Sequence, residues 1–305
     1  MTYDTFKSVI VQKIKQLLPP DTSVQLHPVI KNNGLKLDGL TISNSESNLS
    51  PTIFLNYYYE NRDVFPDFDA ICRDIMLTYT QNKSSEPINI DFFTDYKQIK
   101  EHLAYRIINY EKNKELLQTV PHFRYLDLAI VFYSLLNFSD KGHATILIRT
   151  NHLQLWHICA DELYEQTCRT TPLLLPYDFR CMSDVLSDMF DKDDPFTQDV
   201  QNIQNTPDTF CPMYVLTNTR KLYGASCMLY PCLLEQISEK LQADLFILPS
   251  SVHEIIILPA ANRSHYEELV DMVKEINRTE LTTDEILSDQ IYYYSRHDQA
   301  LSICS

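Results

Sequence analysis

Glycine is scarce in this chain, with only four in 305 residues: Gly34, Gly39, Gly142 and Gly224. Loops that cradle phosphate need clustered glycines, because backbone N–H groups must approach the anion closely. Neither G-x-G-x-x-G nor G-x-x-x-x-G-K-[ST] occurs in the sequence. The sequence therefore disfavours phosphate-loop NTPases and dinucleotide-binding Rossmann proteins, and we expect no cofactor.

Paired cysteines and long apolar runs are also missing. The eight cysteines include no C-x-x-C pair, which disfavours a structural zinc site and is typical of reduced thiols in the cytoplasm. The longest apolar run, Leu126–Phe138, has about a dozen residues and contains Asp127, whereas a bilayer span needs ~20. The first residues lack the basic and then apolar plan of a signal peptide. We expect a cytoplasmic protein that has no membrane contact.

Basic residues are few relative to acidic ones, since 26 Lys and Arg against 41 Asp and Glu give a net charge of −15. Such a charge repels phosphate backbones, so we expect no direct nucleic-acid binding and instead a protein partner, which could be basic. From Asp178 to Asp208 the aspartates far outnumber Arg180 and Lys192. We predict an exposed connection there that carries an acidic binding face, made of Asp184, Asp188, Asp191, Asp193 and Asp194.

The apolar periodicity predicts an α+β fold with mixed, largely antiparallel sheets, helices packed on them and two to three closely packed subdomains. Asn32-Asn33-Gly34 predicts a hairpin turn, since Asn and Gly tolerate positive φ. Thr52–Tyr59 resembles a further strand. The predicted modules are residues 1–82 (helix, three strands, helix), 88–208 (a middle α/β region ending in the acidic connection) and 209–305 (a C-terminal α/β module).

The strongest candidate for a functional site is the segment LFILPSSVHEIIILPA, residues 245–260, in which two apolar runs flank the polar insert PSSVHE. If Val252–Leu258 is extended, Ser251 and His253 share one face while Glu254 points away. Ser251 or Ser250 with His253 is then a candidate nucleophile and base, which Asp127 could support. No G-x-S-x-G elbow accompanies the pair. The alternative is a turn at the sheet end, in which these side chains satisfy backbone groups.

Other chemistry-bearing residues do not form a metal-binding pattern. His152, His157 and Cys159 match neither H-E-x-x-H nor a zinc-finger spacing. Asp191–Asp194 lacks the glycine of a calcium loop and is followed by Pro195 where a ligand would stand. We therefore expect no metal site.

Five segments carry a resemblance to a known family. They are LSPTIFLNYYYE (Leu49–Glu60), Arg106–Tyr133, Met213–Ala225, LPSSVHEIIILP (Leu248–Pro259) and LSDQIYYY (Leu287–Tyr294). Together they resemble an uncharacterised family of proteins of about this length from Gram-positive gut anaerobes, known as a domain of unknown function. The resemblance implies a cytoplasmic bacterial protein, often carried on mobile elements, with no established activity. It also implies that certain motif positions are candidate binding residues: Asn109, Asn113, His122, Asn218, Tyr223, Ser250 and Glu254.

Two functions remain open at this point. The first is a non-catalytic binding or regulatory protein, one version of which is an acidic inhibitor that occupies the basic groove of a nucleic-acid enzyme from a mobile element. The second is a hydrolase or transferase that uses a Ser/His pair of PSSVHE. The missing cofactor motifs and the missing nucleophile elbow favour the first.

Overall fold

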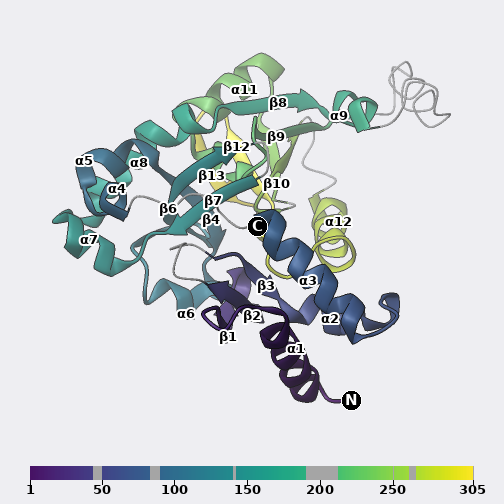
Figure 1. Cartoon of the computed structure of the whole chain (residues 1–305). Helices are drawn as coiled ribbons and strands as arrows, with labels where there is room; N and C mark the ends of the chain where they lie inside the picture. Colours follow the sequence, from purple (N-terminus) through teal and green to yellow (C-terminus); the bar gives the residue numbers. More distant parts are fainter. Residues whose placement is uncertain are drawn as a thin grey trace. The chain divides into compact units, whose positions relative to one another are not determined.

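The computed structural model of the chain describes residues 1–43, 50–82, 90–139, 142–189, 212–249, 251–260 and 266–304. They form an α+β fold whose sheets are built from antiparallel pairs, as the sequence predicts. The chain divides into two compact units, and Figure 1 labels helices and strands of both. Unit 1 contains Met1–Asp95 and Ser139–Lys141, and unit 2 contains Tyr96–Phe138 and Gly142–Ser305.

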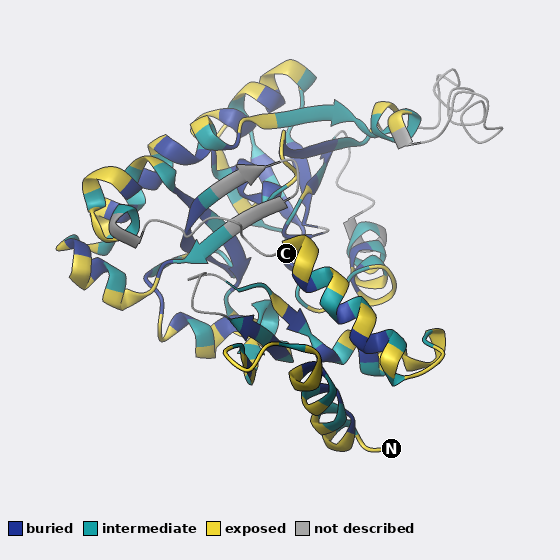
Figure 2. Cartoon of the chain, in the orientation of Figure 1, coloured by how far each residue is buried: buried dark blue, intermediate teal, exposed yellow. Residues whose placement is uncertain are grey.

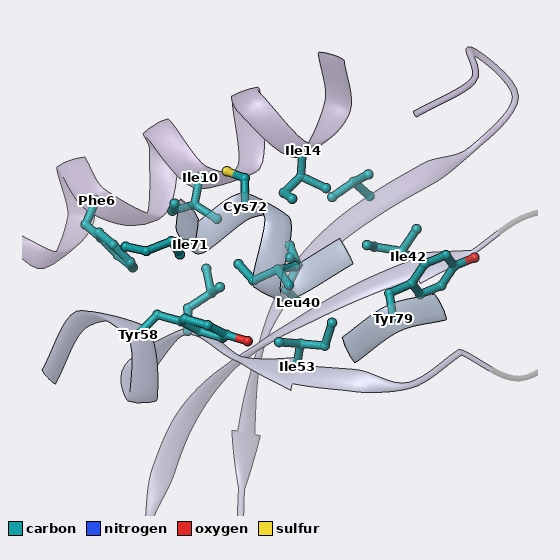
Figure 3. Packing of buried hydrophobic residues seen from close by; sticks show 13 residues of the cluster. Phe6, Ile10, Ile14, Leu40, Ile42, Ile53, Tyr58, Ile71, Cys72 and Tyr79 are labelled. Carbon is teal, nitrogen blue, oxygen red and sulfur yellow. The ribbon is translucent and has the colours of Figure 1, made fainter. Parts of the chain in front are cut away.

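Unit 1 has a three-stranded sheet with helices packed against it. Its elements are α1 (Tyr3–Leu17), β1 (Ser23–Ile30), η1 (Asn32–Gly34), β2 (Lys36–Ser43), β3 (Thr52–Phe54), α2 (Leu55–Glu60), η2 (Arg62–Val64), α3 (Phe68–Asn82) and α4 (Ile90–Thr94). Figure 3 shows Phe6, Ile10 and Ile14 of α1 on the side of the helix that faces the sheet, in one buried cluster with Leu40 and Ile42 of β2. The 3.6-residue period of α1 therefore places one apolar stripe on the sheet.

The predicted hairpin turn is confirmed. β1 and β2 are antiparallel, and Ile30 and Lys36 are the last paired residues before the turn. Between them Asn33 and Gly34 have φ values of 58° and 71°. Only residues that tolerate the left-handed region allow so tight a return, and this explains why the local sequence predicts the turn.

The predicted strand Thr52–Tyr59 is wrong beyond Phe54, where β3 ends and α2 begins. In α2, Leu55 and Tyr58 are buried at helical spacing, whereas Tyr57 is 58% exposed. The side-chain oxygen of Asn56 accepts a hydrogen bond of 2.7 Å from the Asp38 N–H and so fixes the helix start against β2. The β propensity of three consecutive tyrosines is overruled by this tertiary contact.

Unit 2 contains a six-stranded and a four-stranded sheet. Its elements are α5 (Tyr96–Ile99), η3 (Lys100–His102), β4 (Leu103–Asn109), η4 (Glu111–Asn113), α6 (Lys114–Leu117), β5 (His122–Tyr125), β6 (Leu128–Ser139), β7 (Gly142–Leu147), α7 (Thr150–Trp156), α8 (Ala160–Leu174), β8 (Tyr177–Cys181), α9 (Met182–Met189), β9 (Tyr214–Asn218), η5 (Gly224–Leu229), α11 (Leu233–Leu241), β10 (Leu245–Leu248), β11 (Ile255–Pro259), α12 (Tyr266–Thr279), β12 (Tyr292–Ser295) and β13 (Ala300–Ile303). The larger sheet has the order β13-β12-β10-β11-β9-β8, and the smaller has β4-β6-β5 with β7 also paired to β6.

The predicted boundary near residue 208 does not separate two units. β8, from the predicted middle region, pairs with β9, from the predicted C-terminal module, in one antiparallel ladder. Both strands lie in unit 2. The first part of the predicted acidic connection is thus ordered as β8 and α9, while residues 190–211 lie outside the described part of the chain.

The edge strand β4 is covered by side-chain hydroxyls. The Tyr105 N–H donates to Thr171 Oγ1 at 3.0 Å, and the Ile107 N–H donates to Ser226 Oγ at 3.2 Å. Thr170 Oγ1 in turn donates to the Leu103 carbonyl. These bonds satisfy the outer edge of the sheet, which would otherwise invite pairing with another chain. In Figure 2 the helices show bands of buried and exposed residues, as expected of helices that cover a sheet with one face.

We expect the stability of unit 2 to fall at alkaline pH. Burial raises the pKa of the Cys227 thiol from 9.0 to about 12, and burial likewise raises the pKa of Tyr164 from 10.0 to about 12. Because the folded pKa values exceed the unfolded ones, this stability is complete below the unfolded values and is lost as the pH rises towards about 12. Urea midpoints followed by the fluorescence of Trp156 should be flat at neutral pH and decline above about pH 9. Tyr164→Phe should make that decline shallower, and an unchanged slope would contradict the assignment.

Candidate functional site

The candidate serine lies in the turn between β10 and β11, which are antiparallel neighbours. Ser251 is 6% exposed, and its Oγ accepts a hydrogen bond of 3.0 Å from the His253 N–H. The Ser251 N–H donates to the Glu254 carbonyl, which closes the turn. The assumption of an extended Val252–Leu258 is therefore wrong for its first three residues, because the turn bends them. Ser250 lies outside the described residues.

The His253 imidazole is directed at a neighbouring loop. Its Nδ1 lies 3.3 Å from the Tyr223 backbone N and 3.2 Å from the Lys221 carbonyl. With the proton on Nε2, Nδ1 accepts from the Tyr223 N–H. The ring also stacks on the Tyr223 ring, at 5.7 Å between centroids and 13° between planes. The His253 imidazole therefore contacts the loop at Tyr223, and the Ser251 hydroxyl accepts a hydrogen bond from a backbone N–H. In a nucleophile and base pair, the serine hydroxyl would instead be hydrogen-bonded to the imidazole.

Asn218 folds the loop that His253 contacts. Its side-chain oxygen accepts from the N–H groups of Arg220 and Leu222, at 3.0 and 3.2 Å, and its amide donates to the Leu222 carbonyl at 2.7 Å. Lys221 and Tyr223 then adopt left-handed φ values of 52° and 50°. Asn218, a predicted binding residue, is thus a buried loop organiser.

Tyr223 connects this loop to the smaller sheet of unit 2. The Arg106 guanidinium, on β4, lies over the Tyr223 ring at 4.4 Å from its centroid. Tyr133, on β6, meets the same ring edge-on at 5.2 Å between centroids. Arg106 and His253 therefore both contact the Tyr223 ring, and these contacts add cation–π and aromatic stabilisation.

The remaining predicted motif residues serve another turn. Asn109, the last residue of β4, and Asn113 are both buried, and the Asn113 amide donates to the Asn109 carbonyl at 2.8 Å. The Asn109 amide donates to the Leu287 carbonyl at 3.1 Å. His122 Nδ1 lies 3.1 Å from the Val120 carbonyl. These contacts are to backbone groups, so they explain the motif through folding rather than through a ligand.

Asp127 does not support His253 as predicted. It accepts hydrogen bonds from Ser288 Oγ at 2.5 Å and from the Tyr292 hydroxyl at 2.7 Å. Both donors are fully buried. Burial and the nearby Asp127 carboxylate raise the pKa of Tyr292 above its usual range, so this phenol remains a donor. The carboxylate therefore joins the turn before β6 to the segment that leads into β12.

A small pocket lies on the sheet face beside the PSSVHE turn. It has a volume of about 160 Å³, and we call it the sheet pocket; its lining residues are Asp178, Arg180, Met182, Val185, Leu186, Val215, Thr217, Lys221, Glu254 and Ile256. The strand register explains the set, because Asp178 opposes Thr217 while Arg180, Val215 and Ile256 form one row across β8, β9 and β11. Residues two apart in a strand point to the same face. The row of Arg180, Val215 and Ile256 therefore lies on the same side of the sheet as the pair of Asp178 and Thr217.

Sequence reasoning missed most of this pocket. The alternation Asp178-Phe179-Arg180 is the signal that could have found β8, since Phe179 stacks on Tyr214 on the other face. The excess of aspartate in this region instead suggested a connection without regular structure.

The predicted acidic face is partly described. Asp184 and Asp188 are exposed on α9, four residues apart and hence on one helix face. Arg180 pairs with Asp188 at 2.6 Å and with Asp178 at 3.2 Å, and both carboxylates raise the pKa of its guanidinium. Asp191, Asp193 and Asp194 lie outside the described residues. The described part of the acidic face is therefore Asp184 and Asp188.

The residues considered for metal binding have local roles. His157 is the left-handed C-cap of α7, and Cys159 is the N-cap of α8. In the described ranges, no three side chains of His, Cys, Asp or Glu gather where they could hold a metal ion. Among the helices of the same ranges, none combines the length and the apolar character required to cross a bilayer.

These features define an α+β protein with a small amphipathic pocket at a sheet edge. A family model matches residues 3–296, and the chain belongs to that family, DUF5688, which is described as a family of unknown function. No curated protein and no solved structure matches the chain.

Ser251→Ala tests whether the hydroxyl serves the turn. We expect a loss of ~1 kcal/mol in the free energy of unfolding, because the His253 N–H loses its acceptor. Urea unfolding followed by Trp156 fluorescence measures it. Ser302→Ala, at an exposed position of β13, is the matched control and should change stability by less than about 0.5 kcal/mol. Equal effects of the two variants would contradict the role assigned to Ser251.

Proposed function

We propose that the protein is a non-catalytic binding protein that docks a basic protein partner on the acidic face. The observation that carries the proposal is the placement of Asp184 and Asp188 on one exposed side of α9, next to Asp178 on β8. Asp188 has 69% of its side chain exposed, so it is available to a partner although it pairs with Arg180. Complementary charge of this kind steers association and selects among partners.

The turn geometry supports the non-catalytic part of the proposal. A serine hydrolase needs its hydroxyl hydrogen-bonded to the base, whereas the Ser251 hydroxyl accepts from the backbone and His253 faces Tyr223. We extend the proposal to a cytoplasmic bacterial protein from Gram-positive gut anaerobes, carried on mobile elements. In its sharpest form the partner is a nucleic-acid enzyme whose basic groove the acidic face occupies.

The test compares two double variants of equal charge change. Asp184→Asn with Asp188→Asn removes two carboxylates from α9, and Asp271→Asn with Glu275→Gln removes two exposed carboxylates from α12 at the same spacing. Proteins retained from native cell extract on the immobilised chain are identified by mass spectrometry and measured again as pure components. We expect the α9 variant to bind the partner about tenfold more weakly, equivalent to ~1.4 kcal/mol, and the α12 variant to bind it normally.

Salt and activity measurements complete this test. Binding through the acidic face should weaken as ionic strength rises, because exposed charges are screened. A partner whose affinity responds neither to salt nor to the α9 variant would contradict the docking site. Turnover of a small substrate that is abolished by both Ser251→Ala and His253→Ala would replace the binding function with the hydrolase.

A further inference from the structure

The sheet pocket has a polar end and an apolar end. Asp178 and Thr217 are direct partners across β8 and β9, and Glu254 immediately precedes Ile255, which pairs with Leu216. Lys221 follows β9 in the loop that Asn218 folds, at the same end of the strand. Two carboxylates and one ammonium therefore gather where β9 ends.

The other end is apolar. Met182, Val185 and Leu186 of α9 face Val215 and Ile256 of the sheet across the pocket. The volume of about 160 Å³ is close to the ~150 Å³ of an apolar cavity that holds one benzene molecule. The pocket therefore has room for an apolar group of a few carbon atoms, and nucleotides or drug-sized ligands are too large for it.

We propose that the sheet pocket binds a small zwitterion with an apolar side chain, of which a free aliphatic α-amino acid is the simplest example. Lys221 binds the carboxylate, Glu254 and Asp178 receive the ammonium group, and the aliphatic side chain fills the apolar end. A carboxylate accepts several hydrogen bonds, so Asp178 can bind the ligand and still pair with Arg180.

The lysine is what favours a zwitterion over the basic side chain of a protein partner. The pocket lining carries two carboxylates, Asp178 and Glu254, and two cations, Lys221 and Arg180, so an inserted arginine or lysine would leave one positive charge unbalanced. A zwitterion has no net charge and therefore preserves this balance. The proposal is independent of partner docking, because Asp184 and Asp188 do not line the pocket.

The experiment uses the full chain and three ligands of one shape. They are L-leucine, leucinamide, which lacks the carboxylate, and 4-methylpentanoate, which lacks the ammonium. Methyl signals of Val185, Leu186 and Val215 in NMR titrations give the affinity of each. We expect each truncated ligand to bind at least tenfold more weakly than leucine, because a hydrogen bond to a charged group contributes ~1.5–3 kcal/mol.

Two variants separate the charged contacts. Lys221→Gln should weaken the binding of leucine about tenfold and leave the affinity for leucinamide unchanged. Glu254→Gln should weaken the binding of leucine and leave the affinity for 4-methylpentanoate unchanged. Val185→Phe should abolish binding of all three ligands by filling the apolar end. Leu173→Phe, at a position 78% exposed on α8, should not affect binding.

Several results would overturn the inference. Equal affinities of the three ligands would show that the pocket does not recognise their charged groups. Binding that survives Val185→Phe would show that the ligand binds elsewhere. An arginine amide that binds more tightly than leucine would show that the pocket receives a basic side chain. Methyl signals that stay unchanged at millimolar concentrations of every ligand would exclude the site, whether or not the acidic face binds a partner.

Discussion

Gly224→Ala is expected to destabilise unit 2 by ~3 kcal/mol, at the upper end of the usual cost of overpacking. Gly224 is buried at the start of η5, and an added methyl group would overlap the Thr217 hydroxyl and the His253 carbonyl oxygen. It would also lie 2.9 Å from the Asn218 backbone nitrogen. Two of these three obstacles are backbone atoms, so the neighbours cannot move away without opening the turn or the loop.

Trp156, the single tryptophan of the chain, lies in unit 2 and reports the effect of this substitution through its fluorescence in urea. Gly39→Ala is the matched control in unit 1. Its added methyl group would meet methyl groups of Thr52 and Val29, at 2.5 and 3.0 Å, and such side-chain atoms can shift. We expect ~1 kcal/mol or less from Gly39→Ala by circular dichroism, and no shift of the Trp156 transition. A Gly224→Ala protein as stable as the parent would contradict the close contact of loop and turn.

Asp127→Ala is expected to cost ~3 kcal/mol, because it leaves two buried hydroxyls without their acceptor. Ser288 and Tyr292 both donate to this carboxylate and have no exposed surface. Removing one member of a buried polar group is costly, since the desolvated partners stay behind. Urea unfolding followed by Trp156 measures the change.

A double-mutant cycle shows whether the hydrogen bond carries the effect. Tyr292→Phe removes one donor and should cost only ~1 kcal/mol, because the carboxylate retains Ser288. In the Asp127→Ala background the same change should cost less, since the phenol there has already lost its acceptor. Strictly additive losses would show that Asp127 acts through something other than this hydrogen bond.

Structural features that depend only on residues close together in the chain could be predicted from the sequence. The turn at Asn32-Asn33-Gly34 follows from the tolerance of Asn and Gly for positive φ, and the stripe of Phe6, Ile10 and Ile14 follows from helical periodicity. The α+β class follows from many such signals along the chain. Where a local propensity competed with a distant contact, as in Tyr57–Tyr59, the local prediction failed because packing on β2 selects the helix.

The position of the candidate site could be predicted from the sequence, but the roles of its residues could not. PSSVHE does lie at a sheet end, between β10 and β11. The chemistry of its residues depends on partners far away in the chain, because His253 meets Tyr223 and Glu254 meets the pocket of β8 and α9. No periodicity of a short segment contains that information.

Composition and local periodicity alone thus establish an acidic, glycine-poor α+β chain that contains neither of the two glycine-rich phosphate-binding motifs, since these properties reside in residue types and short spacings. The tertiary structure decided the rest. It assigned the Ser251 hydroxyl to a backbone N–H, the Asp127 carboxylate to Ser288 and Tyr292, and the alternating residues of β8, β9 and β11 to one pocket. The physical reason is that hydrogen-bond partners and pocket walls are selected by strand pairing between segments widely separated in sequence.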